Sequence, residues 1–391
     1  MTRTVREYIK LSWQSNEMIM DKQRNKNILI IAESGLGKTG VPNVIFQVVS
    51  ALYNEYNIDI VVFNDNDYYA DKVKELGANI IKIDLKKPES RVKRLFWRLL
   101  KERNIYSKEF NKLFNSKKYD VIHSFKEYDS GYIFDIAKKH NINNFIIHCN
   151  REIYPPKNLI SRFFVNRAMK LARKHVTKLI GVSSQCCEIS YPNIEFEILY
   201  NSYNESKYNH NVICKLKKNE LVLTHIATFS ANKNQLFTLD VFKNVHDKYP
   251  NSKLVLVGME SDVGYLSLIK ERITNLNLEG CVNIIDGSKD FIDILYNTSY
   301  CLLTSLHEAA PISLVEAQAC GIKCFASDTI PSSMDCGGVM YLSIKDPIKW
   351  GDEIVDCFIS NGNKRIDYDM SRFSSTGFKN KLLDIYNKLD R

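Results

Sequence analysis

The sequence predicts an α/β protein with two doubly wound, Rossmann-like domains followed by a C-terminal helix. Two observations support this fold class. Short, strongly apolar runs recur along the chain, and several are separated by stretches of helical length. The series stops in a polar segment and then starts again. Strands and helices that alternate in two blocks are typical of two parallel sheets, each covered by helices on both faces.

The first block contains continuous apolar runs of the kind that parallel sheets bury on both faces. The candidate strands are residues 27–32, 58–64, 79–84, 120–125, 144–150 and 178–184. Segments of helical length lie between several of them, at residues 42–54 and 131–140. We therefore assign residues 27–202 to an N-terminal domain, preceded by a polar extension over residues 1–26.

The second block begins after residue 219 and repeats the pattern. Its candidate strands are "ELVLTHIATFS", "KLVLVGM", "NIIDGS", "SYCLLTS" and "KCFASD", and its candidate helices include residues 235–248 and 263–276. The polar, asparagine-rich segment 200–212 is the expected hinge, because it has no apolar period. The second domain thus covers residues 203–374. Residues 375–391 have apolar positions at helical spacing, and we expect this helix to pack back on the N-terminal domain.

Composition is typical of a globular cytoplasmic protein. Hydrophobic residues make up 45% of the chain and charged residues 25%. No run reaches the roughly 20 apolar residues of a membrane span, and the polar amino terminus does not resemble a secretory signal. The ten cysteines form no two CxxC pairs, which favours reduced thiols over a metal or redox site.

The positive charge belongs to the first half of the chain. Residues 1–200 carry 33 Lys and Arg against 22 Asp and Glu, whereas residues 201–391 carry 21 against 23. Segments 91–101 and 151–178 interleave these cations with aromatic and aliphatic residues, as a helix lying on an anionic membrane surface would. A solvated basic face over the core is the alternative. Nucleic acid is disfavoured, because no recognition-helix, zinc-finger or RNA-binding pattern accompanies the charge.

The most informative motif is "SLHEAAPISLVEAQACGIKCFASD", residues 305–328. Pro311 suits a first helical position and Gly321 suits a helix stop, so the motif predicts a short helix over residues 311–320. The strand before it ends near Ser305. The free N–H groups at the start of this helix would form an anion site suited to a phosphate. They belong to Ala310, Ile312 and Ser313.

Two carboxylates accompany this predicted anion site. Glu308 lies in the turn before the helix, and Glu316 lies within the helix. Carboxylates beside an anion site do not suit a phosphate alone, but they can accept hydrogen bonds from the hydroxyls of ribose and of a sugar. The motif therefore predicts a site for a nucleotide sugar.

In these residues the sequence resembles the retaining glycosyltransferases of family 4, which have the GT-B fold of two facing doubly wound domains. The family hallmark, two glutamates separated by seven residues in a run ending in EA-x-A-x-G, is reproduced from Glu308 to Gly321. The resemblance covers most of the chain. It continues in "GKTGVPNVI" (37–45), "IIHCN" (146–150), "FSANKNQLFTLDVF" (229–242), "KLVLVGM" (253–259) and "VNIIDGS" (282–288).

The resemblance implies transfer of a sugar from a nucleotide diphosphate sugar to an acceptor hydroxyl, with retention at the anomeric carbon. It implies catalytic roles for Glu308, Lys233 and His148, of which Lys233 binds the diphosphate and His148 approaches the sugar. It implies donor contacts from Glu316 to the ribose, from the turn near Ile285, Gly287 and Ser288 to the base, and from Gly258 at a strand end. An ordinary partly buried histidine is the alternative for His148.

The resemblance also implies partners and cofactors. No metal or other cofactor is expected, since Lys233 and the helix N-terminus would stabilise the leaving diphosphate, whose oxygen could itself take the acceptor's proton. The acceptor is expected to be a saccharide or a lipid-linked saccharide, in bacterial surface polysaccharide or glycolipid synthesis. The enzyme would then be cytoplasmic and peripheral on the inner face of the membrane.

The sequence departs from the family pattern at two places. Ala227-Thr228 stand where the family has Gly-Arg, so Thr228 brings no charge to the donor. Ala309 stands where glycine is usual. A non-catalytic GT-B protein, which binds saccharide or chaperones a partner transferase, is therefore an alternative. The intact Glu308, Glu316 and Lys233 argue against it.

Residues 32–39, "AESGLGKT", can also be interpreted as the phosphate loop of a nucleoside triphosphatase. Such a loop has its helix start within Gly-Lys-Thr, whereas the apolar period here predicts a start at Pro42. A triphosphatase would also leave the two glutamates unexplained. We favour the interpretation that Gly37, Thr39 and Gly40 let the backbone approach the sugar and diphosphate of the donor.

Overall fold

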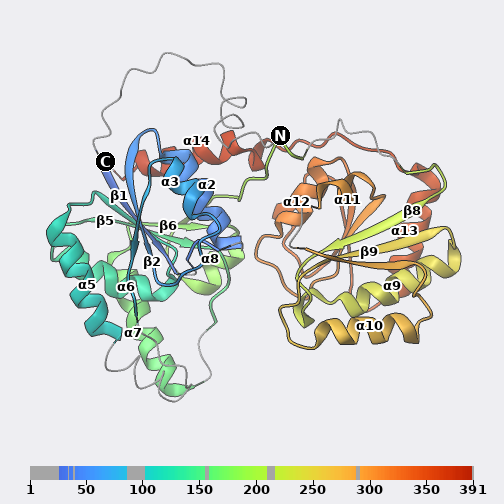
Figure 1. Cartoon of the computed structure of the whole chain (residues 1–391), viewed down its shortest axis with the longest axis horizontal. Helices are drawn as coiled ribbons and strands as arrows, with labels where there is room; N and C mark the ends of the chain where they lie inside the picture. Colours follow the sequence, from blue (N-terminus) through green and yellow to red (C-terminus); the bar gives the residue numbers. More distant parts are fainter. Residues whose placement is uncertain are drawn as a thin grey trace, which may run out of the picture. The chain divides into compact units, whose positions relative to one another are not determined.

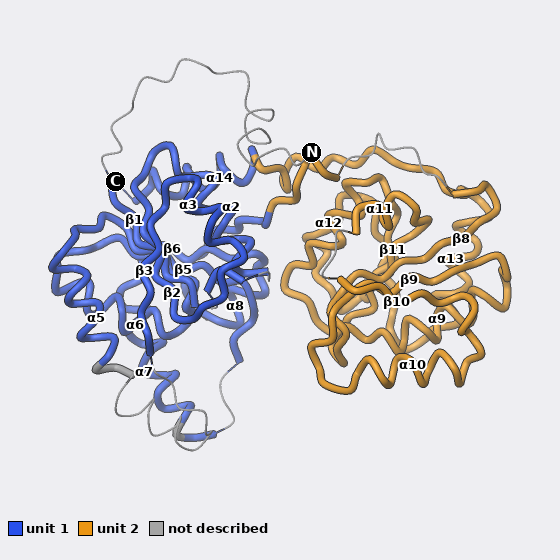
Figure 2. The backbone as a smooth tube through the Cα atoms, viewed as in Figure 1, with its two compact units in different colours: residues 1–201, 376–391 blue, residues 202–375 orange. Residues whose placement is uncertain are grey.

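The structure is a computed structural model that describes residues 26–33, 35–37, 40–85, 102–154, 158–208, 216–287 and 291–389. It divides into two compact units (Figure 2). Unit 1 comprises residues 1–201 and 376–391, and unit 2 comprises residues 202–375. Each unit contains one parallel sheet with helices on its faces, which confirms the predicted fold class (Figure 1). The basic segment 91–101 lies outside the described residues.

The sheet of unit 1 has seven strands in the order β3-β2-β1-β4-β5-β6-β7. The strands are β1 Lys26–Ala32, β2 Tyr56–Val62, β3 Asn79–Lys82, β4 Val121–Ser124, β5 Asn144–Cys149, β6 Lys178–Gly181 and β7 Phe196–Ile198. Strand β1 pairs with both β2 and β4, with Ile28 beside Val121, so the strand order reverses between β1 and β4. Strand β7 was not predicted, because its three residues are only half-buried and form no apolar run.

Helices cover both faces of this sheet (Figure 1). They are α2 Gly40–Leu52, α3 Ala70–Glu75, α5 Glu102–Ser116, α6 Ser130–Lys138, α7 Leu159–His175, α8 Ser184–Ser190 and α14 Ser375–Asn387. Helices α2, α3 and α14 share one apolar core with β1 and β2. Helices α5, α6 and α7 pack in succession on the other side.

Helix α14 is the last helix of the chain, yet its apolar side chains are part of the core of unit 1. Leu382 and Ile385 are fully buried there, beside residues of β1 and α2. Its cationic side extends the attachment, because Lys381 Nζ lies 2.6 Å from Glu197 Oε2 on β7. The chain therefore returns to unit 1 after completing unit 2.

The sheet of unit 2 has six strands in the order β10-β9-β8-β11-β12-β13. The strands are β8 Leu221–Ile226, β9 Ser252–Gly258, β10 Val282–Asp286, β11 Tyr300–Leu303, β12 Lys323–Ser327 and β13 Val339–Leu342. The main helices are α9 Gln235–Lys248, α10 Tyr265–Asn275, α11 Ile292–Tyr296, α12 Ile312–Ala319 and α13 Pro347–Asn361. Helices α9, α10 and α13 share one core, whereas α11 and α12 lie on the opposite face (Figure 1). Strand β13 and helix α13 were not predicted.

Two predicted helix starts need correction. Helix α2 begins at Gly40 rather than at Pro42, because a proline in the first turn replaces an N–H that has no partner within the helix. Its start directly after Gly-Lys-Thr removes one argument against the phosphate loop. Helix α12 begins at Ile312, with Pro311 as its N-cap rather than its first residue. Gly321, with φ +72°, ends α12 as predicted.

Candidate functional site

The predicted donor residues of unit 2 gather where its strand order reverses, between β8 and β11. Parallel α/β sheets bind ligands beyond the carboxyl ends of their strands at such a reversal. The loop after β8 runs from Ala227 to Asn234, and the loop after β11 runs from Thr304 to Pro311. Lys233 lies in the first loop and Glu308 in the second, so the fold brings together two predicted catalytic residues.

An ion pair joins these two residues. Lys233 Nζ contacts Glu308 Oε1, and Ser305 Oγ donates to the same carboxylate oxygen at 2.7 Å. The Glu308 side chain is 10% exposed and that of Lys233 is 22% exposed. A carboxylate with so little exposure requires a compensating charge and hydrogen bonds, and it has both here.

Hydrogen bonds to backbone carbonyls hold the two loops together. Asn232 Nδ2 donates to the carbonyl of His307 at 2.9 Å, and the N–H of Leu306 donates to the carbonyl of Asn232 at 2.8 Å. Thr304 Oγ1 donates to the carbonyl of Asn234 at 3.0 Å, at the left-handed residue that precedes α9. The ion pair is therefore positioned by the backbone and not only by its own attraction.

Helix α12 begins directly after the Glu308 loop. Ile312 and Ser313 are its first two residues, and Ala310 precedes the N-cap, so the predicted N–H groups lie at the helix N-terminus. This terminus carries the positive end of the helix dipole, which favours an anion. Glu316 lies one turn further along the helix and is half-buried.

The packing of the strand ends explains the glycines at Gly258 and Gly287 without any ligand. A Cβ atom on Gly258 would lie 2.0 Å from the carbonyl oxygen of Ala227, and one on Gly287 would lie 2.9 Å from the Gly258 Cα atom. The ends of β8, β9 and β10 approach too closely for a side chain. Thr228 contributes its carbonyl, which accepts from Gln235 Nε2 at 2.9 Å. Ile285 is half-buried in β10.

The sequence analysis did not select His225, which lies one residue before the end of β8. Its Nδ1 atom lies 2.8 Å from Thr238 Oγ1 on α9, and Thr238 Oγ1 lies 2.7 Å from Thr304 Oγ1. Burial, reinforced by the charge of Lys233, lowers the pKa of His225 to about 3. The imidazole is therefore neutral and acts as a polar link between α9 and the two loops.

In unit 1 the glycines of the turn after β1 differ in how much space surrounds them. Gly35 has φ +69°, and a Cβ atom there would lie 1.9 Å from Asn64 Oδ1, so this position requires glycine. Sequence reasoning did not select it. At Gly37 a Cβ atom would lie 3.1 Å from the Cβ of Asn66, whereas at Gly40 nothing lies within 4 Å. Thr39 lies outside the described residues.

His148 lies near the end of β5 and is 1% exposed. Its ring stacks on Phe125, with centroids 4.8 Å apart, and its Nδ1 atom lies 3.2 Å from His123 Nε2. Burial lowers the pKa of His148 to about 3. It is thus a neutral histidine in a buried network, but its Nε2 atom has no hydrogen-bond partner among the described residues.

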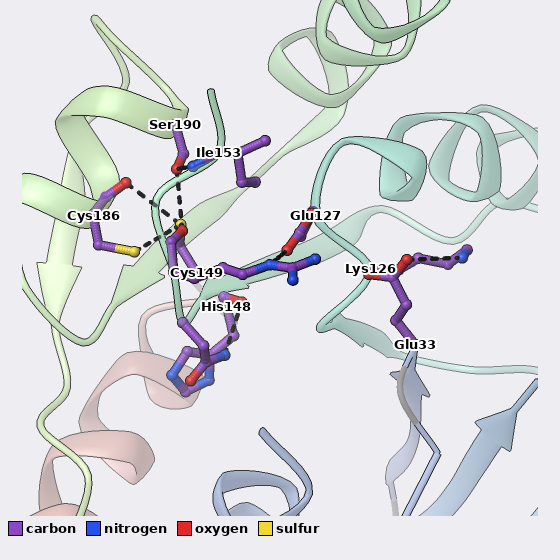
Figure 3. Close-up of polar contacts among 10 residues, drawn as sticks. Glu33, Lys126, Glu127, His148, Cys149, Ile153, Cys186 and Ser190 are labelled. Atoms are coloured by element: carbon purple, nitrogen blue, oxygen red, sulfur yellow. Dashed lines mark hydrogen bonds and ion pairs between the residues drawn. The ribbon is translucent and has the colours of Figure 1, made fainter. Parts of the chain in front are cut away.

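A charged cluster follows the ends of β1, β4 and β5, and the sequence analysis missed it (Figure 3). The Lys126 side chain is 1% exposed, and its Nζ atom lies 3.7 Å from Glu33 Oε1 and from Asp129 Oδ2. Arg151 Nε donates to Glu127 Oε1. Burial raises the pKa of Glu127 against the opposing effect of Arg151. The polar run after the predicted strand 120–125 was the available signal, since the strand order reverses there.

Two cysteine thiols, one at the end of β5 and one on α8, lie close together. Cys186 Sγ lies 3.1 Å from Cys149 Sγ, and both residues are buried (Figure 3). All cysteines that the structure describes are free.

Helix α7 contains most of the described part of the second basic segment. It carries no acidic residue, and its cations Arg162, Arg167, Lys170, Arg173 and Lys174 are all exposed. Leu159 and Phe163 are 79% and 60% exposed near its start. Among the described residues, no helix combines the length and the hydropathy that a membrane span requires.

Comparison with known proteins points to one family. Residues 209–336 match the model of the family "Glycosyl transferases group 1". The putative glycosyltransferase EpsF of Bacillus subtilis is 27% identical over 174 residues, which cover 43% of this chain and 44% of EpsF. The capsular polysaccharide biosynthesis glycosyltransferase CapH of Staphylococcus aureus is 28% identical over 262 residues, 63% of this chain and 66% of CapH. The chain thus spans less than two thirds of each of these relatives.

Solved structures of other proteins have the same fold as this chain. The UDP complex of Anabaena Alr3699/HepE superposes with a TM-score of 0.75 at 16% identity, over 93% of this chain and 100% of HepE. Its UDP-glucose complex gives a TM-score of 0.73 at 15% identity, with the same coverage.

Two parallel, doubly wound units give this chain the GT-B fold of the solved glycosyltransferase structures. Residues 209–336, about a third of the chain and all within unit 2, are similar to the glycosyl transferases group 1.

The close approach of the strand ends in unit 2 leads to a stability prediction. Gly258→Ala places a Cβ atom against the Ala227 carbonyl, so we expect the free energy of unfolding to fall by about 1–3 kcal/mol or more. Gly280→Ala is the matched control, since nothing lies within 4 Å of a Cβ atom there. Calorimetric unfolding should show a lower midpoint for Gly258→Ala only; equal midpoints would contradict the close approach.

Proposed function

We propose that this protein is a retaining glycosyltransferase that moves a sugar from a nucleotide diphosphate sugar to an acceptor hydroxyl. The observation that carries the proposal is the Lys233–Glu308 pair, fixed beside the N-terminus of α12 at the strand reversal of unit 2. A cation, an anion site and two carboxylates match the diphosphate and the hydroxyls of such a donor. The family match over residues 209–336 supports the same conclusion.

In this proposal the diphosphate binds to Lys233 and to the N–H groups of Ala310, Ile312 and Ser313. Charge builds up on the diphosphate as the glycosidic bond breaks, and preorganised cations and dipoles stabilise it most effectively. Thr228 adds no charge, so Lys233 and the helix terminus carry this role without the family's arginine. The leaving phosphate oxygen accepts the acceptor's proton, and no metal is proposed.

In this proposal the two carboxylates, Glu308 and Glu316, bind the hydroxyls of the donor. Glu316 accepts hydrogen bonds from the ribose, and Glu308 accepts them from the transferred sugar. Glu308 keeps its hydrogen bond from Ser305 when Lys233 turns towards a phosphate, so its orientation does not depend on the lysine alone. We also propose that His148 contacts the donor sugar. Uridine is the proposed base, because HepE has been solved with UDP and with UDP-glucose.

Nucleotide binding tests this proposal directly. We expect UDP or a UDP-sugar to raise the unfolding temperature without Mg²⁺, because a ligand at 100 times its dissociation constant adds about 2.7 kcal/mol of stability. Glu316→Ala should raise the dissociation constant about tenfold or more, since a hydrogen bond to a charged group contributes about 1.5–3 kcal/mol. Glu271→Ala, an exposed glutamate on α10, is the control and should bind normally.

The other outcomes discriminate between the remaining interpretations. Unchanged affinity in Glu316→Ala would remove the ribose assignment. Stabilisation by ATP only with Mg²⁺ would favour the phosphate loop at residues 32–39. Nucleotide binding without sugar transfer to any saccharide acceptor would favour the non-catalytic alternative, which Thr228 suggests.

A variant at Gly40 can test donor binding without disturbing the fold. Because Gly40's neighbours among the described residues leave no atom within 4 Å of a Cβ atom there, we expect Gly40→Ala to leave the unfolding temperature unchanged or slightly raised. If the donor approaches this backbone, the added methyl group should raise the donor KM several-fold. Steady-state kinetics with Gly280→Ala as the control would test this, and an unchanged KM would place Gly40 outside the donor site.

We further propose that α7 binds an anionic membrane surface, which would bring the enzyme to a lipid-linked saccharide at the cytoplasmic face. Five exposed cations and no acidic residue give this helix a favourable charge, and Phe163 and Leu159 supply exposed apolar area. Helices of this composition lie in the membrane interface. CapH, as its name states, acts in capsular polysaccharide biosynthesis, which agrees with a surface-saccharide acceptor.

Vesicle binding tests the role of α7. Each Lys or Arg near an anionic surface contributes about 1 kcal/mol, so Arg167→Glu with Lys170→Glu should lower the partition coefficient on phosphatidylserine-containing vesicles at least tenfold at low salt. Lys345→Glu with Lys349→Glu makes the same change of net charge on exposed positions of unit 2. Equal losses in both double variants, or no sedimentation of the wild type, would contradict the assignment.

A further inference from the structure

Two buried thiols of unit 1 lie close enough to be joined by a small movement. Cys149 is the last residue of β5 and Cys186 lies in α8, and their sulfur atoms are 3.1 Å apart (Figure 3). A disulfide bond is about 2.0 Å long, so the two sulfur atoms need to approach by only about 1 Å to form one. The proposed sugar transfer makes no use of this pair.

The hydrogen bonds of the pair give its two members different roles. The Cys186 thiol donates to the sulfur of Cys149, and the Cys149 thiol donates to the carbonyl of Arg151 at 3.3 Å. The bond from Cys186 lowers the pKa of the Cys149 thiol against the effect of burial, whereas the same contact and burial raise the pKa of Cys186. Because the thiolate is the nucleophile, Cys149 is the thiol that attacks an oxidant first.

The segment after β5 provides access to the Cys149 sulfur, which is itself buried. None of residues 150–154 is buried, and the Arg151 carbonyl in this segment contacts the Cys149 sulfur. Arg151 is held by Ser190 Oγ, which donates to the same carbonyl at 3.3 Å, and by an ion pair with Glu127. The Arg151 side chain is 66% exposed, so water screens this ion pair. Local opening of the segment therefore admits a small oxidant without unfolding unit 1.

Other buried thiols are placed differently. Cys187 is fully buried, but its sulfur faces β6, where a Cβ atom on Gly181 would lie 2.1 Å from it. Cys301 and Cys324 are register partners on β11 and β12, two internal strands of the sheet of unit 2. Exposing them requires two paired strands to separate, which costs far more than opening a segment at a strand end. Of these thiols, Cys149 is thus the most accessible to an oxidant.

We propose that Cys149 and Cys186 form a reversible oxidation site, at which hydrogen peroxide converts the two thiols into a disulfide. The Cys149 sulfur attacks one peroxide oxygen, the O–O bond breaks, and the leaving hydroxide takes a proton to become water. Cys149 is then a sulfenic acid. The Cys186 sulfur attacks the Cys149 sulfur, the S–S bond forms, and the sulfenic hydroxyl leaves as the second water with the remaining thiol proton. Two electrons pass from the thiols to the peroxide.

Peptide mapping of the full chain tests this proposal without any substrate. The protein is reduced with dithiothreitol, separated from the reductant, treated with a small excess of hydrogen peroxide, alkylated with iodoacetamide in denaturant, and digested without reductant. We expect the linked peptides of Cys149 and Cys186 to be the main oxidised product, about tenfold or more above any linkage of Cys301 to Cys324. Dithiothreitol should reverse the linkage.

Two matched variants assign the roles of the thiols. In Cys186→Ser no thiol resolves the sulfenic acid of Cys149, so we expect no linkage and capture of the sulfenic acid by dimedone, or its further oxidation to the sulfinic acid. Cys187→Ser changes the adjacent and equally buried thiol. It should keep the linkage at the wild-type level and give no dimedone adduct.

Three results would overturn the proposal. They are a linkage that Cys187→Ser removes, oxidation that reaches Cys301 and Cys324 as readily, and full alkylation of Cys149 and Cys186 in a sample in which the same peroxide oxidises added glutathione. The last result would show two thiols that only pack. Because no step uses a nucleotide or a sugar, failure of the proposed function would leave all these results unchanged.

Discussion

The site in unit 2 depends on one nearly buried ion pair, between Lys233 and Glu308. Each charge would be costly at this depth without the other, and removing one partner of such a pair costs more than the pair itself contributes. The pair exists only because the loops after β8 and β11 are held together by Asn232 and Thr304. Glu308 also accepts a hydrogen bond from Ser305, so the carboxylate has a second partner besides the lysine.

Unit 1 also pairs opposite charges at the point where its strand order reverses, with different residues. At the reversal between β1 and β4, Lys126 is enclosed by protein and lies near the carboxylates of Glu33 and Asp129. Beside it, the exposed Arg151 pairs with the less exposed Glu127. Both sheets thus place compensated charges at the strand ends where their order reverses, which is where doubly wound sheets bind ligands.

Much of the fold could be predicted from the sequence, because continuous apolar runs give most central strands and glycine or proline marks helix ends. Strand β7 could not, since its three half-buried residues form no apolar run. Helix α13 was missed although Asp346 at its N-cap, Pro347 at its start and apolar residues at helical spacing were available signals. For the site, the spacing of Pro311 and Gly321 predicted the loop of Glu308 and the helix of Glu316, because both elements are local in the sequence. Gly35 was missed because its requirement comes from Asn64 on another loop.

The contacts of His148 show why a residue type alone does not define a site. The sequence allowed a donor-binding histidine or an ordinary buried one, and the structure combines both features: a ring packed in the core and one nitrogen without a partner. Tyr386, whose hydroxyl lies 2.8 Å from His123 Nδ1, is 263 positions from His123 in the sequence, on a helix that the chain adds to unit 1 only after unit 2 is complete. Helix α14 therefore contributes a polar contact to this buried network as well as apolar packing.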